Sequence, residues 1–99
     1  MKLGLIADDR DREMQMRALC PVCDDVVVGD MALLLSRLSP SDVVLVWRID
    51  KLGCSLEELS KRIKDVHSAG AEIRFLHEHA SSRDLEVSQL IEVMRKLEV

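Results

Sequence analysis

The chain has 99 residues, 47% of them hydrophobic and 32% charged, which is the size and composition of one soluble globular domain. Its 14 basic and 18 acidic residues give a formal net charge of −4. An acidic domain is a poor nucleic-acid binder by itself, because such affinity comes largely from neutralising phosphates. This length excludes a multidomain enzyme with its own appended DNA-reading module, and we expect residues 1–99 to form a single domain.

The sequence also argues against membranes, export and bound cofactors. No apolar run approaches the ~20 residues that a membrane span needs, and the start lacks the apolar stretch and cleavage site of a signal peptide. Three cysteines without signs of secretion indicate reduced thiols, so we expect a cytoplasmic protein. Trp47 and Phe75 are the only aromatic residues, which removes the stacking platforms used on single-stranded nucleic acid. We expect no cofactor.

Strands and helices are predicted to alternate along the chain. The strands are short apolar or β-branched runs, and the helices have apolar residues at helical spacing. In chain order, the predicted elements are strand Lys2–Ala7, helix Asp8–Leu19, strand Val26–Val28, helix Met31–Leu38, strand Val43–Trp47, a helix between Ser55 and Gly70, strand Ala71–Leu76 and helix Leu85–Leu97.

Caps and turns mark the ends of several of these elements. Asp30 and Ser55 stand where helix N-caps belong, and Glu58 completes a capping-box pattern with Ser55. The segment 39–42, S-P-S-D, has turn composition, and Gly70 suits a helix C-terminus.

Side-chain spacing also predicts which residues of the first and third helices face the core and which face water. The residues predicted to face the core are Met14, Ala18 and Leu19 of the first helix and Leu56, Leu59, Ile63 and Val66 of the third. The residues predicted to face water are Lys61, Arg62, Lys64 and His67.

This alternation predicts an α/β fold: a single-domain three-layer sandwich whose mostly parallel, four- to five-stranded sheet has helices on both faces. Sheets of this kind bind ligands at the carboxyl ends of their strands. The segment 48–55, which follows the third strand, lies at such an end.

Several segments resemble a known family. Residues 44–56, V-L-V-W-R-I-D-K-L-G-C-S-L, resemble the V-V-W-K-L-D-R-L-G-R-S-L segment of serine recombinases, the resolvases and invertases. Residues 8–19, D-D-R-D-R-E-M-Q-M-R-A-L, are similar to that family's first helix, D-D-Q-D-L-E-x-Q-x-x-A-L. Residues 69–76 look like its G-V-x-F-x-S-L strand, and residues 39–42 fit its R-P-G-D turn. The resemblance therefore covers nearly the whole chain and implies a resolvase-like fold.

The resemblance implies a reaction in which a serine hydroxyl attacks a DNA phosphate while arginines stabilise the developing charge. This chain departs from that pattern at most of the catalytic positions. The segment that carries the nucleophile is missing between the first strand and Asp8, and no serine precedes Ser36. Of the central motif, Asp50 is kept, while Lys51 and Cys54 replace arginines. If Asp8 and Asp9 occupy the nucleophile's place in an acidic pocket, phosphate binding there is not expected.

We therefore interpret the chain as a degenerate, truncated recombinase domain associated with DNA recombination and mobile elements. On this reading it is catalytically inactive and acts as a binding, dimerisation or regulatory module, as a homodimer or with an active recombinase, and binds DNA weakly or not at all alone. The candidate oligomer interface consists of Leu90, Ile91, Met94 and Leu97.

The alternative is an enzyme with residual DNA cleavage or phosphate binding. Its candidate residues are the remnants Asp50, Lys51 and Cys54, with Arg48 and Lys51 as DNA or phosphate ligands. The simpler interpretation, which we favour, is that Asp50 and Lys51 are a solvated loop pair. Ser55 is disfavoured as a replacement nucleophile because it already serves as a helix cap.

Cys20 and Cys23 form a C-x-x-C motif, which can be half a zinc site or a redox pair. His77 and His79 would supply two further ligands, but they follow a different strand. Redox motifs of this kind begin a helix after a strand, whereas this one ends a helix. We therefore favour two buried or half-buried thiols without a metal, and an inert Cys54.

Overall fold

The computed structural model describes residues 1–53, 55–77 and 79–82. These form one five-stranded sheet, three α-helices and a single 3₁₀ turn, η1. In chain order the elements are β1 (Lys2–Ile6), α1 (Arg12–Leu19), β2 (Asp25–Val28), α2 (Met31–Arg37), β3 (Val43–Val46), η1 (Ile49–Lys51), α3 (Leu56–Ser68), β4 (Glu72–Phe75) and β5 (Ala80–Ser81).

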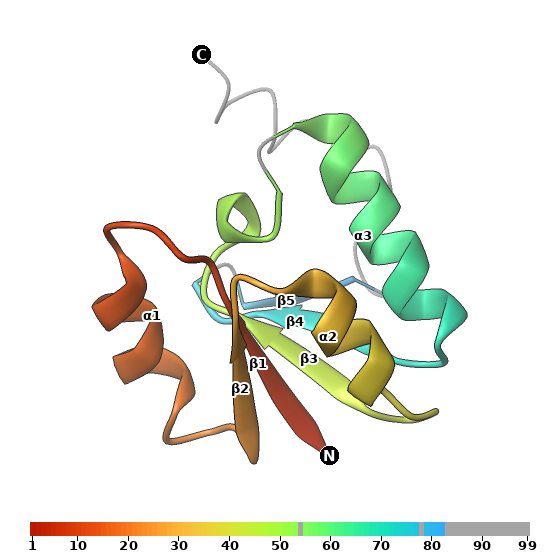
Figure 1. The fold of residues 1–99 in the computed structure, drawn as a ribbon, viewed down its shortest axis with the longest axis horizontal. Coiled ribbons are helices and arrows are strands. Elements are labelled where there is room, and N and C mark those ends of the chain that lie inside the picture. The colour runs from red at the N-terminus through yellow and green to blue at the C-terminus, as the bar shows by residue number, and fades with distance from the viewer. Residues whose placement is uncertain (54, 78, 83–99) are drawn as a thin grey trace.

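The strand order in the sheet is β2-β1-β3-β4-β5. The first four strands are parallel, and β5 pairs antiparallel with β4. Because β1 lies between β2 and β3, the chain leaves β1 in one direction and later returns to its other side, which creates a crevice at the carboxyl ends of the strands. Figure 1 shows the segment after β1 and the η1 turn together at that end of the sheet. The predicted α/β sandwich is confirmed.

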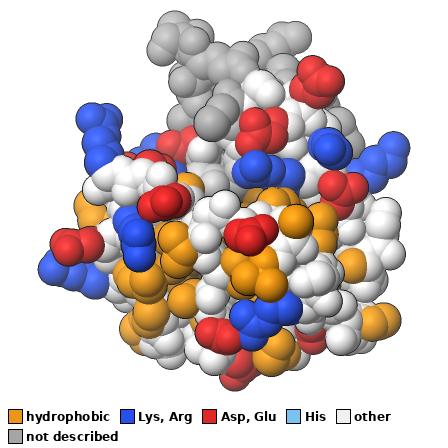
Figure 2. Space-filling view, in the orientation of Figure 1, with side chains coloured by type: hydrophobic (Ala, Val, Ile, Leu, Met, Phe, Trp, Pro, Cys, Tyr) orange, Lys and Arg blue, Asp and Glu red, His pale blue; other side chains and the backbone are white. Residues whose placement is uncertain are grey.

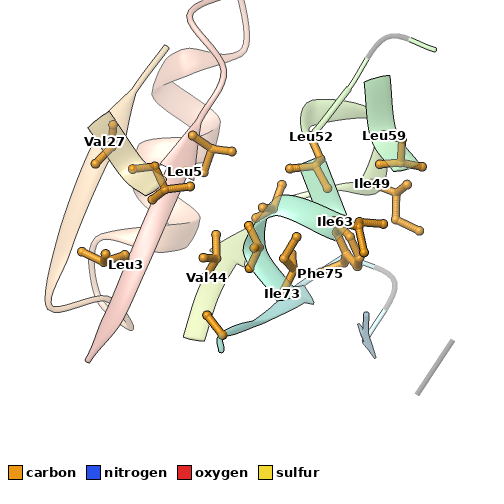
Figure 3. Packing of buried hydrophobic residues seen from close by; sticks show 14 residues of the cluster. Leu3, Leu5, Val27, Val44, Ile49, Leu52, Leu59, Ile63, Ile73 and Phe75 are labelled. Atoms are coloured by element: carbon orange, nitrogen blue, oxygen red, sulfur yellow. The ribbon is translucent and has the colours of Figure 1, made fainter. Parts of the chain in front are cut away.

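Alternating strand residues divide the core into two layers. On one face, Leu3, Leu5, Val44 and Val46 pack with side chains of α2 and α3 in the larger hydrophobic cluster. In Figure 3, Ile63 of α3 lies beside Phe75 of β4, and Leu59 of α3 lies beside Ile49 from the segment after β3. The predicted apolar stripe of α3 is confirmed at Leu59, Ile63 and Val66, all buried.

The opposite face is covered by α1. Ile6, Leu45 and the helical Leu19 form the second cluster, with Met16 and Cys23 packed against it. Gly4 permits this close packing, because a Cβ there would lie 2.9 Å from Val26 Cγ1 and 3.0 Å from Cys23 Sγ. The sheet is therefore covered on both faces, as predicted.

The start of the first helix differs from the prediction. The helix begins at Arg12 rather than Asp8, because Asp9 and its neighbours form a turn. The Asp9 side chain accepts a hydrogen bond from Asp11 N at 2.9 Å, and Asp9 O accepts one from Arg12 N at 3.1 Å. Short acidic side chains compete with helical hydrogen bonding in this way. The buried face of the helix also differs from the prediction, since Met14 is 56% exposed and Gln15 is fully buried.

Two residues predicted to face water are partly buried. The Arg62 guanidinium donates a hydrogen bond to the Leu52 carbonyl. His67 Nε2 lies 2.8 Å from Ser82 Oγ, which also accepts from Ile73 N and so links the end of α3 to β4. The predicted helix Leu85–Leu97, with its candidate interface, and Cys54 lie outside the described residues.

The turn between α2 and β3 provides a test of backbone strain. Ser41 has φ of 74° and occupies the position of the glycine in the similar R-P-G-D turn. A left-handed conformation costs an L-residue about 1–2 kcal/mol. We therefore predict that Ser41→Gly raises the free energy of unfolding by about 0.5–1 kcal/mol, measured by urea denaturation.

Ser60→Gly is the matched control, because Ser60 is exposed within the right-handed helix α3. It should lower the free energy of unfolding by about 0.5 kcal/mol. A Ser41→Gly protein no more stable than the wild type would contradict the strain at Ser41.

Candidate functional site

A pocket of about 310 Å³ lies at the carboxyl ends of β1, β2 and β3, in the crevice expected from the strand order. Its charged lining contains more carboxylates than cations, and none of the described residues that line it is a serine. The carboxylates are those of Asp8, Asp9, Asp30, Asp50 and Glu58, and the cations are Lys51 and Arg62. Asp8 and Asp9 follow directly after β1 and Ala7, the place where the recombinase pattern has its nucleophile.

A buried glutamine fixes the short connection from β1 to α1. Gln15 Oε1 accepts a hydrogen bond from Ala7 N at 2.8 Å, and Gln15 Nε2 donates to Ala7 O at 3.1 Å. The same Nε2 lies 3.2 Å from Asp9 Oδ1. One side chain thus satisfies both backbone groups of Ala7 and holds Asp9 at the mouth of the pocket.

Lys51 is the only cation that the central motif supplies to the pocket lining, and two carboxylates hold it. Its Nζ lies 2.7 Å from Asp11 Oδ2 and 3.0 Å from Asp9 Oδ2, and its side chain is 12% exposed. Burial by itself lowers the pKa of Lys51, but the hydrogen bonds to Asp11 and Asp9 outweigh it, so the pKa lies above its ordinary value. The cation is thus directed toward the protein's own carboxylates.

The same contacts act on Asp9. Burial raises the pKa of Asp9, while the hydrogen bonds from Lys51 and from Asp11 N lower it, and the pKa ends below its ordinary value. Both groups therefore remain charged at neutral pH, and the pair is a permanent feature of the pocket in that range.

Arg48 and Asp50, two further candidates, face each other. Arg48 Nε lies 3.0 Å from Asp50 Oδ1, although the two atoms are not in hydrogen-bonding geometry. The Arg48 guanidinium also lies 5.7 Å from the centre of the Trp47 ring. Of the two, only Asp50 lines the pocket. The motif therefore contributes a carboxylate and an already paired lysine to this site.

Ser55 is positioned as a helix cap. Its Oγ accepts a hydrogen bond from Glu58 N at 3.2 Å, as predicted. The Glu58 carboxylate pairs with Arg62 Nη2 at 2.9 Å, so the second pocket cation is also partnered by an acid. Ser55 does not line the pocket.

The C-x-x-C cysteines and the two histidines lie at opposite ends of the sheet. Cys20 and Cys23 precede β2, whereas His77 and His79 follow β4, which runs parallel to β2. The zinc set of two cysteines and two histidines is therefore not assembled, and the described residues contain no group of three His, Cys, Asp or Glu able to hold a metal. Burial raises the pKa of Cys23 to about 11, which disfavours the reactive thiolate of a redox pair.

Fold and pocket together define an α/β domain with a doubly wound parallel sheet and its crevice at the strand carboxyl ends. A family model described as "Resolvase, N terminal domain" matches residues 29–98, more than two thirds of the sequence. The chain therefore belongs to the resolvase N-terminal domain family. No curated protein matches the sequence. The matched range leaves out β1 and α1, the elements on either side of the short connection.

Family membership indicates a recombination-related function. Within the described residues, no helix has the length and apolar character to cross a membrane. The sequence analysis named Asp8, Asp9, Asp50 and Lys51, which line the pocket, but missed Gln15, which bonds to Ala7 and Asp9. The sequence did contain a signal for this residue, because the second glutamine of the family's first-helix pattern falls on Gln15.

We predict that Gln15→Leu lowers the free energy of unfolding by about 2–3 kcal/mol. The leucine fills the space but leaves Ala7 N without its partner, whereas Ala7 O keeps the hydrogen bond from Asp9 N, and an unsatisfied buried polar group costs about 1–3 kcal/mol. Chemical denaturation measures the change. Met14→Leu, at an exposed position on the same helix, should change stability by less than about 0.5 kcal/mol. Equal losses of stability in the two variants would show that the Gln15 amide does not stabilise the connection between β1 and α1.

We predict a pH-dependent effect of Lys51→Met. The pKa of Asp9 is lowered in the folded state, so the ionised carboxylate stabilises the fold at pH values above its unfolded-state pKa. This stabilisation is lost as the pH falls through the folded-state pKa. The pKa of Lys51 is raised in the folded state, so the stabilisation that its charge provides is lost only at strongly alkaline pH. The substitution should cost about 1 kcal/mol near neutral pH and much less once the pH has fallen below the folded-state pKa of Asp9.

Urea denaturation across this pH range measures the difference, and Lys61→Met, at an exposed position of α3, is the control. A loss that persists unchanged at low pH would mean that Lys51 does not stabilise the fold through these carboxylates.

Proposed function

We propose that this domain is a non-catalytic member of its family, which has lost the serine mechanism and acts in recombination by binding another protein chain. The observation that carries the proposal is the state of Lys51, which is bound by Asp9 and Asp11 within the pocket at the strand ends. A DNA phosphate in this pocket would have to displace both carboxylates.

The charge of the pocket supports this reading. With five carboxylates and two cations in the lining, a phosphodiester would enter a site that already has an excess of negative charge. Phosphoryl transfer needs the opposite, since cations must stabilise the charge on the equatorial oxygens. On the face seen in Figure 2, acidic and basic side chains are interspersed, unlike the basic stripe of a duplex-binding surface.

The alternative, a residual phosphate-binding enzyme using Asp50 and Lys51, gains no support from the geometry. The Asp50 carboxylate lies beside Arg48, and Lys51 is already paired with Asp9 and Asp11. Lysine also lacks the planar fork with which arginine binds two phosphate oxygens.

The first test is DNA cleavage. We expect no nicking and no covalent protein–DNA adduct when the protein is incubated with a supercoiled plasmid carrying candidate sites, because the described residues that line the pocket include no serine and no unpaired cation. Denaturing electrophoresis and mass spectrometry detect the adduct, and an active serine recombinase is the positive control. A phosphoserine adduct on this chain, abolished by alanine at the modified serine, would overturn the proposal.

Association with another chain is the second part of the proposal. The fold residues of the sheet and helices are retained beside the lost catalytic ones, which is the pattern of a domain kept for its shape. The sequence places Leu90, Ile91, Met94 and Leu97 at helical spacing, and such a stripe is suited to packing on a second copy or on an active recombinase.

We predict a species larger than the single-chain mass of 11.2 kDa in size-exclusion chromatography with light scattering, or co-purification with an active recombinase. Leu90→Glu should weaken either complex, because it introduces a charge into the apolar stripe. Ser88→Glu, in the same segment but off the stripe, should not. A strict monomer that captures no recombinase would contradict this part of the proposal.

A further inference from the structure

Three sulfur-containing residues, Met16, Cys20 and Cys23, follow one another around the end of α1, on the side of the molecule away from the pocket. Cys20 Sγ lies 3.5 Å from Met16 Sδ. Cys20 N donates to Met16 O at 2.9 Å, and Cys23 N donates to Leu19 O at 3.0 Å, so helical hydrogen bonding continues past the last residue of α1. Met16, Cys20 and Cys23 therefore follow one another at i, i+4 and i+7, along one face of this helical segment.

The three residues differ in solvent exposure, so that one sulfur is accessible to a ligand and the other two are held against the core. Cys20 is exposed and gives access from solvent. Cys23 is half-buried, and its Sγ lies above Gly4, where a Cβ would come within 3.0 Å of it. Met16 is half-buried against the cluster of Ile6, Leu19 and Leu45. An exposed thiol thus lies beside a thioether, and a second thiol follows three residues later, with the thioether and the second thiol both packed against the core.

We propose that Met16, Cys20 and Cys23 form a site for a soft monovalent metal ion, Cu(I). Thiolate and thioether sulfurs are soft ligands that suit Cu(I), and three sulfur ligands fit its low coordination number. Structural zinc requires four ligands, and the described residues supply no further Cys, His, Asp or Glu to complete that set. Binding converts two thiols to thiolates, two protons pass to the solvent, and the copper stays Cu(I) throughout.

The test is an anaerobic titration of the purified, fully reduced protein with Cu(I) in competition with a chromogenic Cu(I) chelator. We expect one Cu(I) per chain. Cys20→Ser, at an exposed position that the core does not need, should lower the affinity by about 100-fold, and Met16→Leu by about 10-fold. Circular dichroism of each metal-free variant confirms that it is folded.

Two matched controls separate this site from general sulfur chemistry. Met14→Leu removes an exposed thioether from the same helix, and Cys54→Ser removes the third thiol of the sequence, and both should retain wild-type affinity. Unchanged affinity in Cys20→Ser, or an equal loss in Cys54→Ser, would overturn the site. A loss of Cu(I) affinity in Cys20→Ser with no loss in Met16→Leu would overturn the assignment of three sulfur ligands.

Discussion

The hydrogen bonds of the Gln15 amide with Ala7 are the interaction on which the rest of the site depends. They close the backbone immediately after β1 and leave room for only a tight turn before α1. That turn places Asp9 at the pocket, and Asp9 together with Asp11 then captures Lys51 from the segment after β3. A single buried amide therefore links the end of one strand to the charge state of a loop far away in the sequence.

The consequence for function is electrostatic. A family that handles phosphates needs cations directed into the crevice at the strand ends, whereas this chain directs carboxylates there and neutralises the lysine that remains. The fold tolerates the change because its two apolar layers lie below the crevice and do not depend on its charge. The same architecture can thus remain stable while the charges at its crevice change, in line with the separation of fold from site.

The sequence predicted the architecture well, because apolar strand runs, the Asp30 and Ser55 caps and the stripe of α3 all point to one arrangement. It was wrong where local chemistry competes with periodicity. Asp9 forms a turn, so α1 begins at Arg12, and Gln15 is buried instead of Met14 because its amide bonds to Ala7 and Asp9. The partners of Lys51 were beyond prediction, since Asp9 and Asp11 lie about forty positions away, and only the tertiary fold brings them together.

The central claim, that the pocket does not accept a phosphate, is tested most directly by an NMR titration. Inorganic phosphate, and then a short DNA duplex, would be added to ¹⁵N-labelled protein while the amide shifts of residues 7–11, 29–31 and 50–53 are followed. We expect no saturable shifts in these segments at millimolar phosphate, because Lys51 stays bound to Asp9 and Asp11. Saturable shifts confined to these three segments would contradict it.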